Sequence, residues 1–174
     1  RHVELEPSGA VGTRFDNAAE DFRLLADHEH GDWRGTLGLQ WRNVDLVVAG
    51  EEAFVPASRT RNLAVFLFEE VGLGAGTLEL GVRAERQRLV LVGQERSDTA
   101  LGLATGWVWP WTDALRWSVQ LTRSQRLPGA TELHAAGPHL AMGRYEIGDN
   151  TLGRETARTL DLTLHGRDAD LENQ

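Results

Sequence analysis

The chain of 174 residues is long enough for one domain that buries most of its surface. Its 18 basic and 26 acidic residues give a formal charge of −8, so no net basic field exists to attract phosphates, and we expect no nucleic-acid partner. Cysteine is absent, which excludes disulfide frameworks, thiolate zinc sites and cysteine nucleophiles.

Alternation of apolar and polar residues is the strongest pattern in the chain, and it is typical of strands with two chemically different faces. We expect a first strand at 1–6 and a longer one at 11–29. In the third, at 33–46, Trp33, Leu37 and Trp41 alternate with polar residues such as Arg34 and Gln40. The same period predicts further strands at 60–71, 76–92, 98–109, 113–124 and 155–166.

The connections between these strands are alternately short and long. Turn-like segments lie at 31–32, 72–76 and 110–113, whereas longer and more polar segments lie at 47–59, 92–98 and 126–154. This arrangement predicts an all-β fold, an antiparallel up-and-down meander of about eight strands. Outer-membrane β-barrels have such short turns at the periplasmic end and long loops at the outer end.

The alternation by itself leaves open which face of the sheet is covered. In an outer-membrane barrel the apolar faces meet lipid, whereas in a small self-contained eight-stranded barrel that binds a ligand or partner they fill a core. Four of the six tryptophans lie within a few residues of a short turn, where either an aromatic girdle or ordinary turn packing would place them. A third possibility is an isolated sheet that self-associates through its exposed edge strands.

The late part of the chain carries a series of short motifs. It reads Ser-Gln-Arg-Leu-Pro at 124–128, Glu-Leu at 132–133 and Gly-Asp-Asn-Thr-Leu-Gly-Arg-Glu-Thr at 148–156. In this order the motifs resemble the late barrel of TonB-dependent receptors. The insert Gly-Pro-His at 137–139 resembles the subgroup associated with zinc uptake, and 12–17, 50–56 and 58–62 are similar to the same subgroup. Residues 129–131 and His134 differ from the residues that the family usually has in this loop.

The resemblance implies a transport function. Residues 1–174 would form one segment of an outer-membrane β-barrel, without the plug domain and the early strands, in a bacterial receptor for uptake of a metal ion, with zinc as the first candidate. The implied partners are outer-membrane lipid, the metal ion, TonB and the plug domain of the full-length protein. We expect no enzyme activity and no required cofactor, since the sequence has no phosphate loop, nucleophile elbow or His-Glu-x-x-His motif.

The candidate metal ligands are histidines and carboxylates in the long connections, because imidazole nitrogen and carboxylate oxygen both bind zinc. By the resemblance, Glu52 and His139 are the first candidates, and Glu51 and His134 are the second. Each also has a plainer interpretation as a solvated loop residue. The His-Glu-His sequence at 28–30 also has the composition of a metal clip, but we interpret it as a solvated turn because it lies at the short-turn end.

Overall fold

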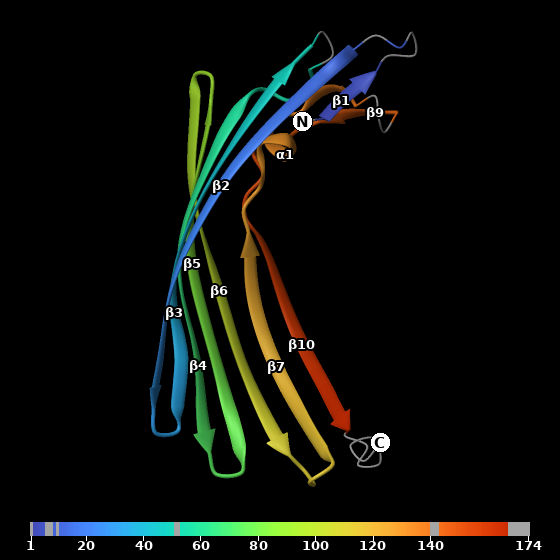
Figure 1. The fold of residues 1–174 in the computed structure, drawn as a ribbon. Helices are drawn as coiled ribbons and strands as arrows, with labels where there is room; N and C mark the ends of the chain where they lie inside the picture. Colours follow the sequence, from blue (N-terminus) through green and yellow to red (C-terminus); the bar gives the residue numbers. More distant parts are fainter. Residues whose placement is uncertain (1, 6–8, 10, 51–52, 140–142, 167–174) are drawn as a thin grey trace, which may run out of the picture.

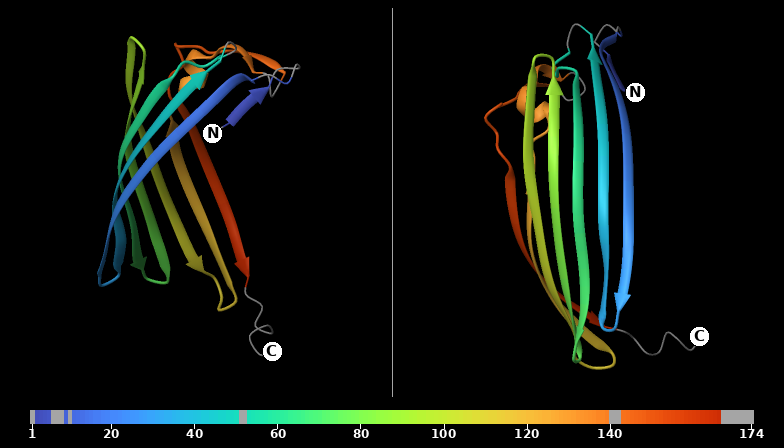
Figure 2. Two further views of the ribbon diagram at one scale, coloured as in Figure 1. Left: turned by 45° about the horizontal axis from the view of Figure 1, so that its top comes forward. Right: turned by 90° about the vertical axis from the view of Figure 1, so that its left-hand side faces the viewer.

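The computed structural model of the chain describes residues 2–5, 9, 11–50, 53–139 and 143–166. Eight strands form a single antiparallel sheet in the order β1-β2-β3-β4-β5-β6-β7-β10, a meander that curves along its length (Figures 1 and 2). Their bounds are β1 His2–Leu5, β2 Val11–His30, β3 Trp33–Ala49, β4 Ser58–Leu73, β5 Gly76–Leu91, β6 Gln94–Pro110, β7 Leu115–Arg126 and β10 Glu155–Gly166. The predicted eight-stranded antiparallel meander is therefore confirmed.

The long segment between β7 and β10 has secondary structure of its own. It contains a short helix, α1 (Ala130–His134), and a hairpin of two short strands, β8 (Ala136–His139) and β9 (Arg144–Ile147). Figure 1 shows α1 and β9 at the end of the sheet where β1 lies, opposite the short turns. In the described part of the chain, no helix is long and apolar enough to cross a membrane.

The two faces of the sheet differ in chemistry, as the alternation predicts. We call the face on which α1 packs the inner face and the opposite one the outer face. The strand register aligns apolar residues in rows across the outer face: Leu37 pairs with Leu67, Leu67 with Val82, and Val82 with Leu103. Half of the surface of Leu37 is exposed, and Leu103 is also exposed. The chain itself therefore leaves a broad apolar surface uncovered.

Buried apolar residues gather instead at the end of the sheet that carries the long loop. One cluster consists of Leu89, Leu91 and Leu133, which packs α1 onto β5. A second cluster contains Phe54, Val55 and Ala135. These clusters fasten the loops to the inner face, but they are too small to be the core of a domain of this length.

Tryptophans mark both limits of the apolar outer surface. Trp33 and Trp107 lie in one register row near the short turns, and Trp109 and Trp117 pair in the next, with ring centroids 5.8 Å apart. Trp41 lies eight residues above Trp33 on β3. At about 3.3 Å per residue and a strand tilt of about 40°, this separation is roughly 20 Å along a membrane normal, close to the apolar band of outer-membrane barrels.

One prediction made from the sequence is wrong, and one alternative does not fit the structure. The segment 92–98 is no long loop, because β5 and β6 continue to a two-residue turn at Val92-Gly93, in which Gly93 has a φ of 74°. The segment 126–154 is a long connection, as predicted, and it also contains α1, β8 and β9. The self-contained closed barrel fails because β1 pairs with β2 and β10 with β7, while no pairing joins β1 to β10 among the described residues. With the sheet open, its apolar face cannot fill a core of its own.

Candidate functional site

The start of the long loop is held by charge-assisted hydrogen bonds. Arg126, the last residue of β7, donates from its two terminal nitrogens to the Glu132 carboxylate at 2.8 and 2.7 Å. The backbone N–H of Gly129 donates to the same carboxylate at 2.8 Å. A bidentate arginine–carboxylate pair fixes orientation as well as distance. Glu132 therefore sets the direction of α1 above the sheet.

The pKa of Glu132 follows from these bonds and gives a first testable prediction. The Arg126 guanidinium, helped by the Gly129 N–H, lowers the pKa of this carboxyl from 4.5 to about 2. Because the folded pKa is depressed, the pair stabilises the loop fully above pH 4.5, and its contribution is lost as the pH falls toward 2. A carbon-13 NMR titration of Glu132 should therefore have its midpoint near 2, and in Arg126→Gln the midpoint should rise toward 4.5 while the Gly129 N–H keeps it below that value.

The matched control for this titration is Arg154→Gln, since Arg154 donates to the Thr99 carbonyl at 3.1 Å and has no contact with Glu132 among the described residues. It should leave the Glu132 midpoint unchanged. A wild-type midpoint near 4.5 would contradict the role of Arg126.

The β8–β9 hairpin is bonded both to α1 and to the loop between β3 and β4. The backbone N–H of Gly148, just after β9, donates to the Ala135 carbonyl at 2.6 Å, and that of Asp149 donates to the Glu132 carbonyl at 2.9 Å. The N–H of Ala136 donates to the Phe54 carbonyl at 2.7 Å. The α1 helix, the hairpin that follows it and the sequence-distant loop between β3 and β4 thus form one platform at the long-loop end of the sheet.

His139 is the candidate ligand on this platform whose ring is held by two described contacts. Its Nδ1 lies 2.8 Å from Oε1 of Glu146, a diagonal neighbour across the β8–β9 pair. Its ring stacks on Phe54 with centroids 4.7 Å apart, and Phe54 in turn meets the edge of Phe15 at 5.7 Å. His139 and Glu146 are both about a quarter exposed. A carboxylate bonded to one ring nitrogen orients an imidazole so that the other nitrogen can bind a metal.

The other three predicted ligands have no described contact with His139. Glu51 and Glu52 lie outside the described residues. His134 ends α1 and is half-buried, and no contact joins it to His139 in the part of the chain that the structure describes. Within that part, no three histidine or acidic side chains are grouped closely enough to hold a metal ion. The described contribution to a metal site is therefore one histidine with its orienting carboxylate.

The His-Glu-His sequence lies at the short-turn end of the sheet, as predicted. His28 is exposed there, and its Nε2 lies 3.1 Å from Oε2 of Glu69 on the outer face. This end is remote in the fold from the β8–β9 hairpin (Figure 1).

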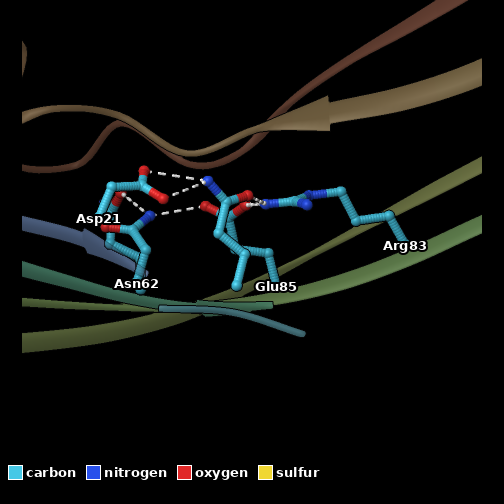
Figure 3. A network of polar contacts seen from close by, with 6 residues as sticks. Asp21, Asn62, Arg83 and Glu85 are labelled. Carbon is cyan, nitrogen blue, oxygen red and sulfur yellow. Dashed lines mark hydrogen bonds and ion pairs between the residues drawn. The ribbon is translucent and has the colours of Figure 1, made fainter. Parts of the chain in front are cut away.

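The inner face carries a continuous network of polar side chains. Gln40 donates to Asp21 at 3.1 Å and accepts from Arg83 at 3.2 Å. Arg83 also donates to Glu85 at 2.7 Å, and Asn62 donates to Glu85 at 2.6 Å, so the network joins β2, β3, β4 and β5 (Figure 3). Such a face suits contact with water or with another polar surface.

Sequence reasoning missed two features of the platform. The first is the stacking of Phe54 on His139, which joins loops more than 80 residues apart and leaves no local signal. The second is the pairing of β8 with β9. Gly143, which precedes β9 with a φ of 60°, is a turn signal between two short strand-forming segments and is the residue from which this hairpin could have been predicted.

Comparison with known families agrees with this architecture. The family model described as "TonB dependent receptor-like, beta-barrel" matches residues 6–172. The match covers the whole meander from β2 to β10 and the platform loop between β7 and β10. Together with the long strands, the short turns at one end and the apolar outer face, it shows that the chain belongs to the TonB-dependent receptor-like β-barrel family.

Proposed function

We propose that this barrel segment belongs to a receptor for a divalent metal ion, with zinc as the first candidate, and that His139 binds the ion at the outer mouth. Receptors of this family are outer-membrane transport proteins that work with a plug domain and with TonB. The observation that carries the metal proposal is the 2.8 Å contact between His139 Nδ1 and Glu146, since a carboxylate that accepts the Nδ1 proton leaves Nε2 as the metal-binding atom.

The surroundings of His139 support this role. The ring is half-buried against Phe54, so its orientation is set before a ligand arrives. Glu52 precedes Phe54 by two residues in the sequence, and Glu51 lies next to it. These two side chains are the carboxylates closest in sequence to the residue that stacks on His139. One imidazole and one or two carboxylates, completed by water or by the plug domain, form a donor set that zinc accepts.

The test is zinc binding measured by isothermal titration calorimetry on the detergent-solubilised protein. We expect Glu146→Gln to weaken binding about 10- to 100-fold, the usual effect of losing an orienting carboxylate, and His139→Ala to weaken it more. Glu52→Ala should weaken it as well. His165→Ala is the matched control, because His165 lies on β10 near the short-turn end.

Unchanged zinc affinity in His139→Ala would refute the site. Titration with manganese, cobalt and nickel ions in parallel tests the identity of the metal, because affinity alone does not select zinc among divalent ions.

A further inference from the structure

Two arginines on the outer face stand directly opposite each other. Arg123 of β7 and Arg158 of β10 are register partners in the same row as Leu67, Val82 and Leu103. Like charges in directly opposed positions destabilise a strand pair. No carboxylate contacts either guanidinium among the residues that the structure describes. The pair is therefore a local excess of two positive charges beside the apolar side chains of Leu103, Leu121 and Leu160.

Three other arginines on this face have polar partners, whereas Arg61, which stands opposite Arg88, has no hydrogen-bonded partner among the described residues. Arg88 is bonded to Glu95 at 2.6 Å, Arg59 to Asp45, and Arg86 to the Ser97 hydroxyl at 3.2 Å. The contrast shows that the sheet can neutralise outer-face arginines with its own side chains, and that it does not do so at Arg123 and Arg158.

The pair lies where the apolar run of each strand stops. Along β7, Trp117, Val119 and Leu121 lead up to Arg123, and the next outer-face residue is Gln125. Along β10, Leu164, Leu162 and Leu160 lead up to Arg158, which is followed by Thr156. Since Trp109 and Trp117 mark the short-turn end, Arg123 and Arg158 lie where the apolar residues of β7 and β10 end on the side of the long loops. Barrel strands are tilted, so residues of one register row lie at different depths, and the depth of this pair differs from that of Leu37 in the same row.

A shallow apolar hollow in the outer face adjoins the pair. Arg123 and Arg158 are part of its lining, and most of the remaining side chains are aliphatic: Leu67, Leu80, Val82, Leu103, Leu121 and Leu160. The hollow also contains Glu69, which is held by His28 at 3.1 Å. Two cations at one side of an aliphatic depression match an amphiphile with an anionic head and a hydrocarbon tail.

We propose that Arg123 and Arg158 bind the phosphate group of an acylated lipid in the outer leaflet of the outer membrane, with an acyl chain of that lipid in the adjoining hollow. A phosphate oxygen accepts hydrogen bonds from guanidinium groups, and two guanidiniums side by side offer complementary donors. The bound phosphate would also remove the repulsion between the two arginines. This proposal is independent of the metal site, which lies on the loop platform.

The experiment uses the protein extracted from the outer membrane in mild detergent and measured by native mass spectrometry. The probes are phosphorylated lipid A, the same lipid without its phosphates, and inorganic phosphate alone. We expect phosphorylated lipid A to bind, and the Arg123→Gln/Arg158→Gln double variant to bind it roughly 30-fold more weakly, since each arginine at a membrane surface contributes about fivefold. The affinity should fall as salt rises.

The matched control is Arg23→Gln/Arg42→Gln, which removes two arginines from the inner face. It should bind lipid A as the wild type does. Arg123→Lys/Arg158→Lys keeps both charges and should retain most of the binding, so it distinguishes a binding defect from a folding defect.

Three results would overturn the proposal. Equal binding of lipid A by the wild type and the Arg123→Gln/Arg158→Gln variant would show that the two arginines do not bind the lipid. Equal binding of the dephosphorylated lipid would show that the phosphate is not recognised. Binding of inorganic phosphate as tightly as lipid A would show that the acyl chain in the hollow contributes nothing.

Discussion

Replacing Gly148 by alanine should detach the β8–β9 hairpin from α1. A Cβ at this position would lie 2.5 Å from the backbone nitrogen of His134, 2.6 Å from that of Ala135 and 2.7 Å from the Leu133 carbonyl carbon. These are backbone atoms, so no side-chain rotation can relieve the overlap. The hydrogen bond from Gly148 to the Ala135 carbonyl would break as the chain shifts.

We expect the free energy that holds the hairpin on α1 to fall by about 2 kcal/mol, in the usual range for overpacking. Amide hydrogen exchange of residues 127–139 and 143–154, followed by mass spectrometry, should speed up by roughly 30-fold. Zinc affinity should fall in parallel, because the hairpin carries both His139 and Glu146.

Gly153→Ala is the matched control, since no atom lies within 4 Å of a Cβ built there. It should leave exchange and zinc binding unchanged. If Gly148→Ala and Gly153→Ala behave alike, the packing of the hairpin on α1 does not determine the structure of the platform.

An arginine in place of Leu37 should destabilise the barrel in a bilayer by about 2–4 kcal/mol, the range for a charge on the lipid-facing midplane of an outer-membrane barrel. Leu37 lies halfway between Trp33 and Trp41 on β3, on the outer face, and half of its surface is exposed. The guanidinium would have to enter hydrocarbon without a partner. The measurement is guanidinium-induced unfolding of the protein folded into phospholipid vesicles.

Thr36→Arg provides the comparison, because Thr36 is the next residue along β3 and faces inward, where its hydroxyl donates to Asp27 at 2.7 Å. An arginine there can pair with the same carboxylate, so we expect a change below about 1 kcal/mol. A larger penalty at Thr36 than at Leu37 would reverse the assignment of the two faces.

Much of the sheet could be predicted from the sequence because its signals are local. The alternation in 33–46 and 113–124 has a period of two, and Gly31-Asp32 is a turn signal that needs no tertiary information. The error at 92–98 has a physical cause. Polar residues such as Gln94, Arg96 and Asp98 look like a loop in the sequence, but β6 extends beyond the apolar band, where both of its faces are polar.

Less of the candidate site could be predicted. The motif at 137–139 identifies His139, but the pairing of His139 with Glu146 depends on the β8–β9 register. The contact with Phe54 depends on how far the curved sheet brings the two long loops together. The proposed lipid site could not be predicted from the sequence. Arg123 and Arg158 are 35 residues apart in the chain and become neighbours only through the β7–β10 pairing.

The sequence by itself determined that the chain is an antiparallel meander with chemically distinct faces and short turns at one end. Only the tertiary structure decided which face is outer, which loops meet and which charges remain unpaired. The physical reason is that a period of two is the same whichever face is covered, whereas the direction of curvature and the pairing of distant strands belong to the sheet as a whole.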